Sequence, residues 1–413
     1  MKHFFFLFFI SFAFVSCDND DSNYELVTVA KAKVISKADL RAQIEVESPK
    51  PITNTGKFYF YQDYIFVNDG EGVHIIDNRN PDSPQKISYI KVPGTKDMEV
   101  KDDILYVDSY SDLVLFDLSN INDIVPLDVF EDVFNGYDRV IPAVEQQVDF
   151  YDYGTFDFDQ NIIVGWEYSQ EIRRIDPNPP IYFDDAVSEN SDGGGGDIGE
   201  GGSFASFKIV KDYLYTVDRS TLYVFDISNG KDPVAMGQEN VGWNIETIFN
   251  KEDYLYIGSS NGMFIYDILN AEAPSKVTSI SHITGCDPVV VDGDYAYLTL
   301  RGGNNCGQDL SFLEVIDITN KSNPLILGDY DMDEPYGLGT HSDFLFVSDG
   351  PNGLKIYNKT NPRDLKLVEV KEDLNIFDVI PLQDKLLLIG DGMLHQYHYS
   401  GNSLELISTF SLN

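Results

Sequence analysis

Residues 212–228 read DYLYTVDRSTLYVFDIS, and residues 253–269 read DYLYIGSSNGMFIYDIL. Both stretches open on Asp, continue with an alternating apolar run and a polar turn, and close with a second apolar run that contains a late Asp. Self-similarity at a fixed period is the sequence signature of a repeat architecture. We therefore expect further copies elsewhere in the chain.

The pattern occurs seven times. Each copy opens at an acidic residue that precedes an apolar run: Asp63, Asp103, Asp212, Asp253, Asp294, Asp343 and Asp384. Five copies end their second run in Asp, namely Asp77, Asp117, Asp226, Asp267 and Asp317, and the last two end in Asn358 and His398. Successive openings lie 40, 109, 41, 41, 49 and 41 residues apart, so only the 109-residue step breaks the period.

Each copy predicts four short strands. Val, Ile, Tyr and Phe alternate with polar residues, and Gly, Asn, Asp and Pro bound the runs. No ten-residue apolar pattern of helical period separates these strands, which argues against parallel βαβ units. Four-stranded units of this length predict an all-β fold, a β-propeller of seven blades with an N-terminal extension and one inserted segment. We expect the blades at residues 57–94, 95–139, 203–242, 243–285, 286–335, 336–375 and 376–413.

The second apolar run of each copy resembles the LVIVD repeat, as in GVHIID (72–77) and LEVID (313–317). The resemblance covers roughly residues 55–413, and the last two copies depart from it because they lack the closing Asp. It implies a propeller in an extracytoplasmic protein of bacteria or archaea. The family carries no established catalytic residues, so the resemblance implies a fold and a location more than an activity.

The first residues are typical of a lipoprotein leader. Residues 1–16 combine Lys2 with an apolar segment too short to span a bilayer, which predicts a signal peptide. Phe14-Val15-Ser16-Cys17 looks like a lipobox, so we expect Cys17 to carry lipid; an ordinary signal peptide with an incidental Cys is the alternative. The acidic stretch 18–21 resembles the export signal of surface lipoproteins in Bacteroidetes-type bacteria. We therefore expect residues 17–25 to be a lipidated tether and the protein to lie on the cell surface, anchored in the outer membrane.

Two segments lie outside the repeats. Residues 26–56 predict a strand, a short helix capped by Ser36 and an extended stretch, and we expect them to pack on the rim of the propeller. The insertion at about 140–202 contains SDGGGGDIGEGG, which favours a flexible loop over a calcium-binding repeat. Asn161–Val164 and Ile172–Asp176 could be a degraded further copy, so the blade count stays open between six and eight.

The amino-acid composition excludes some classes of binding partner. The chain has 29 Lys and Arg against 68 Asp and Glu, a net charge of −39, which repels nucleic acid and anionic headgroups. Contact with a membrane must then come from the lipid at Cys17. No nucleophile, phosphate-binding or zinc motif occurs, so we expect no catalytic residues, no metal and no cofactor. We expect a monomer.

Propeller geometry predicts where a ligand would bind. The segments that lead into each first strand and the loops between the second and third strands open on one face, at the mouth of the central channel. Ligands of closed β architectures collect at such mouths. On this face we select five residues as the candidate binding site: Asp97, Glu246, Asp287, Arg301 and Tyr336.

A disulfide is predicted in the fifth blade. Cys286 and Cys306 are the only cysteines besides Cys17. Cys286 lies where a first strand begins, and Cys306 lies in the loop between the second and third strands, so both fall on the same face. An extracytoplasmic compartment permits the bridge.

Two functions of different class remain. The first is a non-catalytic surface module that binds or scaffolds a protein or glycan partner. The second is a propeller enzyme that acts on extracellular glycans through carboxylates at the channel mouth. Clustered aromatic side chains with a carboxylate pair at the mouth would favour the enzyme.

Overall fold

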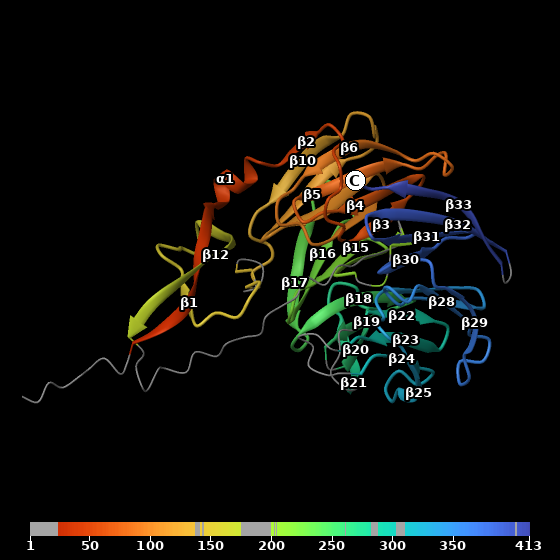
Figure 1. The fold of residues 1–413 in the computed structure, drawn as a ribbon. Helices are drawn as coiled ribbons and strands as arrows, with labels where there is room; N and C mark the ends of the chain where they lie inside the picture. Colours follow the sequence, from red (N-terminus) through yellow and green to blue (C-terminus); the bar gives the residue numbers. More distant parts are fainter. Residues whose placement is uncertain are drawn as a thin grey trace, which may run out of the picture.

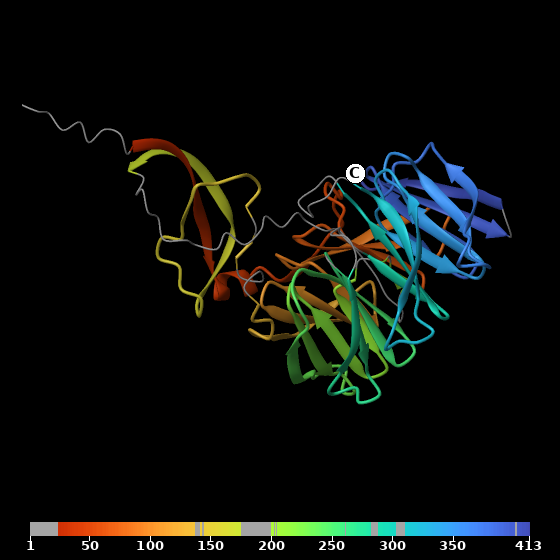
Figure 2. The same ribbon diagram turned by 90° about the horizontal axis from the view of Figure 1, so that it is seen from below.

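A computed structural model describes residues 24–136, 141–142, 144–174, 200–201, 203, 205–260, 262–281, 288–302, 310–400 and 403–413. Within these residues, seven antiparallel sheets of the predicted four-strand pattern follow one another around a ring (Figures 1 and 2). The prediction of a seven-bladed propeller is therefore confirmed. We number the blades 1 to 7 in chain order.

The strands of each blade run from the innermost to the outermost in sequence order. Blade 1 contains β3 (Phe58–Tyr61), β4 (Tyr64–Asn68), β5 (Gly72–Asp77) and β6 (Gln85–Lys91). Blade 2 contains β7 (Met98–Lys101), β8 (Ile104–Ser109), β9 (Asp112–Asp117) and β10 (Val125–Phe130). Blade 3 contains β14 (Phe207–Val210), β15 (Tyr213–Val217), β16 (Thr221–Asp226) and β17 (Val234–Asn240).

The remaining blades repeat this arrangement. Blade 4 contains β18 (Ile245–Lys251), β19 (Tyr254–Ser259), β20 (Gly262–Asp267) and β21 (Ser275–Ser281). Blade 5 contains β22 (Val289–Asp292), β23 (Tyr295–Leu300), β24 (Phe312–Asp317) and β25 (Leu325–Asp331). Blade 6 contains β26 (Leu338–His341), β27 (Phe344–Ser348), β28 (Leu354–Asn358) and β29 (Lys366–Lys371). Blade 7 contains β30 (Asp378–Pro381), β31 (Lys385–Gly390), β32 (Met393–Ser400) and β33 (Ser403–Ser411).

The hydrophobic core is divided among the interfaces between neighbouring blades. Successive side chains of a strand point to opposite faces of the sheet, so each strand supplies two interfaces. In β19, Leu255 and Ile257 pack toward blade 3, whereas Tyr256 packs toward blade 5. The alternation of the repeats therefore encodes two buried faces per blade, which only a closed ring can cover.

The closing Asp of the repeat has a structural role. In the first five copies its carboxylate accepts a hydrogen bond from the backbone N–H two residues later, as Asp117 does from Ser119 at 2.9 Å. Asn358 makes the same bond to Thr360 with its side-chain oxygen, at 3.1 Å. The sixth copy thus keeps the turn although it loses the Asp, because an amide oxygen accepts the bond as a carboxylate does.

Ring closure joins blade 7 to blade 1. Phe58, Ile65 and Ile76 of blade 1 pack with Ile380 and Leu387 of blade 7 in one buried cluster. Two buried amides add a reciprocal pair of hydrogen bonds: Asn78 Nδ2 donates to Gln396 Oε1 at 3.0 Å, and Gln396 Nε2 donates to Asn78 Oδ1 at 2.8 Å. Buried polar groups that satisfy each other in this way fix one geometry of the closing interface.

A long two-stranded ribbon projects from the propeller (Figures 1 and 2). It consists of β1 (Tyr24–Ser36) and β12 (Asn161–Arg174), which pair antiparallel along their whole length, and β11 (Phe150–Asp152) adds to β1 in parallel. The alternative of a degraded further copy at residues 161–164 and 172–176 is therefore not borne out for residues 161–164 and 172–174. These residues belong to β12, and no eighth blade forms in the described parts of the insertion.

The rest of the N-terminal extension contacts the propeller. The predicted cap of α1 (Lys37–Arg41) is confirmed, because Ser36 Oγ accepts a hydrogen bond from the N–H of Asp39 at 3.0 Å. After it, β2 (Glu45–Glu47) pairs with the outer edge of β6. Among the described residues, no helix has the length and apolar character needed to cross a membrane.

Candidate functional site

The predicted binding residues belong to the mouth face, which we define as the segments leading into the innermost strands together with the loops between the second and third strands. Asp97, Glu246, Arg301 and Tyr336 lie there in blades 2, 4, 5 and 6. Asp287 lies outside the described residues, as do Cys17, Cys286 and Cys306.

Asp97 is buried beneath this face and joins three blades. It forms an ion pair with the buried Lys57 of blade 1. Its Oδ2 accepts hydrogen bonds from the backbone N–H groups of Ser206 and Phe207 at 2.6 and 2.7 Å, at the start of blade 3. Each of these bonds crosses a blade boundary, so Asp97 ties the inner strands together below the surface.

A second buried carboxylate stands beside this pair. Glu99 in β7 is 0% exposed, and neither of its oxygens makes a hydrogen bond of normal geometry among the described residues. Burial raises the pKa of Glu99 to about 7, against the opposing charges of Lys208 and Lys57. No sequence signal singles out Glu99, because its strand MEVK alternates like any other inner strand.

The chain itself crosses the central channel. Strand β13 (Glu200–Gly201) pairs with Tyr59 and Phe60 on the inner edge of β3. Ser203 is buried, and its hydroxyl accepts a hydrogen bond from the N–H of Leu338 in blade 6 at 2.9 Å. The end of the insertion therefore contacts the inner strands of blades 1 and 6 before it reaches blade 3.

Most carboxylates of the mouth turns are engaged within the fold. Asp108 Oδ1 accepts the N–H of Lys96 at 2.7 Å, and Asp218 accepts the N–H of Thr221 at 2.8 Å. Asp349 is fully buried, accepts the N–H of Glu334 at 2.9 Å and pairs with Lys355 at 2.5 Å. These carboxylates stabilise turns, as Asp commonly does.

Arg301 and Tyr336 do come together. The Arg301 guanidinium lies 4.1 Å from the centroid of the Tyr336 ring, a cation–π contact between blades 5 and 6. Thr299 Oγ1 also donates to the carbonyl of Tyr336 at 2.6 Å. Gly350, with a φ of +54°, lies against the ring, and a Cβ there would approach Tyr336 Cε2 to 2.9 Å. The Asp349-Gly350 turn therefore holds the ring in place.

Blades 3 and 4 present the most exposed aromatic side chain of the described mouth face. Trp243 leads into β18 and is 74% exposed. Beside it, Arg219 Nη2 of blade 3 donates to Asn244 Oδ1 at 3.2 Å. Glu246 follows at a β-bulge in β18 and is half-buried. Sequence reasoning selected Glu246 and missed Trp243, because the exposure of the indole depends on the conformation of the turn.

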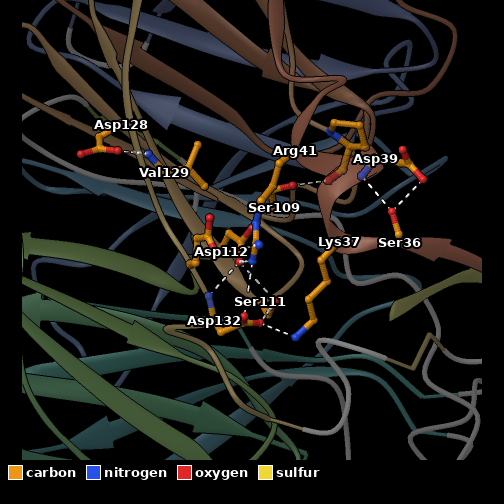
Figure 3. Close-up of polar contacts among 12 residues, drawn as sticks. Ser36, Lys37, Asp39, Arg41, Ser109, Ser111, Asp112, Asp128, Val129 and Asp132 are labelled. Carbon is orange, nitrogen blue, oxygen red and sulfur yellow. Dashed lines mark hydrogen bonds and ion pairs between the residues drawn. The ribbon is translucent and has the colours of Figure 1, made fainter. Parts of the chain in front are cut away.

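The N-terminal helix contacts the mouth face of blade 2 through the side chains of Lys37 and Arg41 (Figure 3). Arg41 makes two hydrogen bonds to the buried Asp112, at 2.7 and 2.9 Å, and one to Glu131 at 2.8 Å. These contacts raise the pKa of Arg41. Lys37 Nζ lies 2.5 Å from Asp132 Oδ1. Partial desolvation raises the pKa of Asp132, but the hydrogen bond to Lys37 and the nearby charges outweigh it, so that pKa is lowered. This set of contacts is the α1 clamp, and it fixes the ribbon to the propeller.

Within the described residues, no three His, Cys, Asp or Glu side chains converge to hold a metal ion. The mouth face offers the exposed indole of Trp243 and the Tyr336 ring beneath Arg301, and buried carboxylates lie below it.

Solved structures similar to this chain share its architecture. A periplasmic gluconolactonase of Pseudomonas aeruginosa matches with a TM-score of 0.54 and 11% identity, over 86% of this chain and 96% of that one. The computationally designed protein Ika8 matches with a TM-score of 0.52 and 10% identity, over 88% and 89%. A protein from Lactobacillus plantarum matches with a TM-score of 0.50 and 12% identity, over 78% and 85%. At such identities the likeness concerns the fold alone.

The seven closed blades and these likenesses define the chain as a β-propeller. Three of its repeats, at residues 201–240, 246–281 and 286–332, match the LVIVD repeat. The matched residues cover blades 3 to 5, where the closing Asp is present. No curated protein matches the chain.

Proposed function

We propose that this propeller is a lipid-anchored surface protein that binds a partner, a protein or a glycan, through its mouth face without catalysis. Trp243 carries the proposal. Its side chain is 74% exposed, and the next residue in its turn, Asn244, accepts a hydrogen bond from Arg219 of the neighbouring blade. Trp, Tyr and Arg are the residues that contribute most to binding energy in protein interfaces.

The composition of the face favours a protein partner over a glycan. The cation–π contact between Arg301 and Tyr336 adds a second aromatic ring with an Arg two blades further on. Both aromatic residues lie beside backbone that is held by hydrogen bonds, so little backbone conformational entropy is lost when a partner docks. With a net charge of −39, the surrounding surface suits a neutral or basic partner.

The alternative function, an enzyme acting on extracellular glycans through mouth carboxylates, has less support. Asp97, Asp218 and Asp349 accept hydrogen bonds from the fold's own backbone. The described end of the insertion also crosses the channel in which a substrate would bind. The similar gluconolactonase shares only the fold, at 11% identity, so it does not indicate catalytic residues in this chain.

The test is affinity capture from cell envelopes with three versions of the full chain: wild type, Trp243→Ala with Arg219→Ala, and a matched control, Leu325→Ala. Leu325 is also exposed but lies on the outer strand of blade 5. We expect one specific component to be captured by the wild type and the control and lost from the double variant. Equal capture by all three would contradict the proposal.

A further inference from the structure

The free end of the ribbon has one uncovered apolar face. Cross-strand partners point to the same side of a sheet, and the register pairs Tyr24 with Arg174 and Leu26 with Ile172. These four side chains therefore share one face, which we call the ribbon tip. Tyr24, Leu26 and Ile172 are 54%, 64% and 74% exposed.

The same face is covered nearer the propeller. Ala30 and Trp166 point to this side and pack with Ile141 and Val144 in a buried cluster. On this face the polar pair of Thr28 and Gln170 follows the covered cluster, and beyond it Leu26, Ile172 and Tyr24 form a separate exposed apolar group. The opposite face at the tip differs, because Arg173 there lies over the ring of Phe150 and pairs with Glu171 at 2.9 Å.

The charge of the ribbon tip is unusual for this chain. Its charged side chain is Arg174, whereas Glu25 and Glu171 point to the other face. A chain with a net charge of −39 therefore presents here an apolar surface with a tyrosine and an arginine. Tyrosine and arginine are the side chains that reach from an apolar surface into headgroups at a membrane interface.

The ribbon tip is also the described part of the fold that a lipid on Cys17 would hold nearest the membrane. Tyr24 follows Cys17 by seven residues, which span at most about 25 Å when fully extended. From Tyr24, β1 runs roughly 40 Å to Ser36 at the α1 clamp. Both views show the start of β1 at the end of the ribbon away from the propeller (Figures 1 and 2).

We propose that the ribbon tip inserts Tyr24, Leu26 and Ile172 into the headgroup region of the phospholipid membrane that holds the anchor. This inference rests on the proposed lipid at Cys17 and assigns a second contact between the protein and the membrane. Two contacts fix orientation where a lipid alone leaves the protein free to tumble. The ribbon then acts as a stalk that holds the propeller away from the bilayer.

The experiment uses the lipidated protein in vesicles of phosphatidylethanolamine and phosphatidylglycerol with brominated acyl chains, which quench nearby tryptophan. The chain has two tryptophans, and Trp166→Phe with Trp243→Phe removes both, so Tyr24→Trp becomes the sole reporter. We expect quenching of this reporter and none of native Trp243 in a Trp166→Phe control. Leu26→Ser with Ile172→Ser should abolish the quenching, whereas Leu269→Ser with Leu325→Ser, two exposed positions on the propeller, should preserve it.

The outcomes separate the two proposals. An unquenched reporter on protein that stays bound to vesicles would overturn the contact of the ribbon tip and leave the anchor standing. Mass spectrometry that finds Cys17 without lipid would overturn both. Unchanged circular dichroism and melting temperature in every variant exclude misfolding as the cause.

Discussion

Replacing Glu99 by Gln tests the electrostatics of the buried inner strands. The Glu99 carboxyl lies in β7 with no exposed surface, and Lys57, Asp97 and Lys208 are the charged groups that act on it. Burial dominates and disfavours the ionised form. The substitution Glu99→Gln keeps the size of the side chain and removes its charge.

The size of the expected change in the free energy of unfolding follows from the pKa of Glu99. The folded protein holds the pKa of Glu99 at about 7, against 4.5 for an ordinary Glu. Because the folded-state value is the higher one, the stability that this group gives is fully present below pH 4.5 and is lost as the pH rises through 7. At about 1.4 kcal/mol per unit, the whole loss amounts to about 3 kcal/mol.

The assay is urea unfolding of wild type and Glu99→Gln at pH 5 and pH 8, with the exposed Glu405→Gln as the matched control. Between pH 5 and pH 8, the free energy of unfolding of the variant should rise by about 2–3 kcal/mol relative to that of wild type. The value is below the whole loss because a small part of that loss falls below pH 5. Glu405→Gln should show no such gain. A difference between Glu99→Gln and wild type that is the same at both pH values would refute the reasoning.

Three further predictions follow from named contacts. Arg41→Ala should weaken the attachment of α1 to the propeller by about 1–3 kcal/mol and speed amide hydrogen exchange over residues 37–43. Arg41→Lys should protect these amides only in part, because Lys cannot make both bonds to Asp112. Unchanged exchange in Arg41→Ala would contradict this prediction. Gln396→Leu should lower the free energy of unfolding by about 1–3 kcal/mol because it leaves the buried Asn78 amide unpaired. Adding Asn78→Leu should recover part of that loss. If the losses of the two substitutions simply add, this pair does not close the ring. Thiol counting on denatured, unreduced protein should find Cys286 and Cys306 joined in a disulfide. Such a bridge should contribute roughly 3 kcal/mol to the free energy of unfolding. Two free thiols per chain would disprove the bridge.

The propeller could be predicted because its information is local and repeated. A run such as DYLYIG specifies a strand with two buried faces, and seven copies leave ring closure as the way to cover those faces. The drift of the sixth copy to Asn358 looked like a weakening of the motif. The structure shows that the turn needs only an oxygen acceptor, which Asn supplies.

Contacts between distant segments could not be predicted. The pairing of β1 with β12 joins residues more than a hundred positions apart, and each strand alternates as a blade strand would. Nothing local marks Ser203 as a residue that bonds to blade 6, or Glu99 as a buried carboxylate whose oxygens lack normal hydrogen bonds. Asp97 was selected as a surface ligand because sequence shows its position on the mouth face and not its depth.

The most direct test of a binding mouth face is photo-crosslinking on living cells. A benzophenone amino acid would replace Trp243 on the mouth face in one protein and Leu325 on the outer strand of blade 5 in another. The proposed function predicts one discrete adduct from position 243 and none from position 325. The absence of an adduct at 243, or the same adducts from both positions, would contradict it.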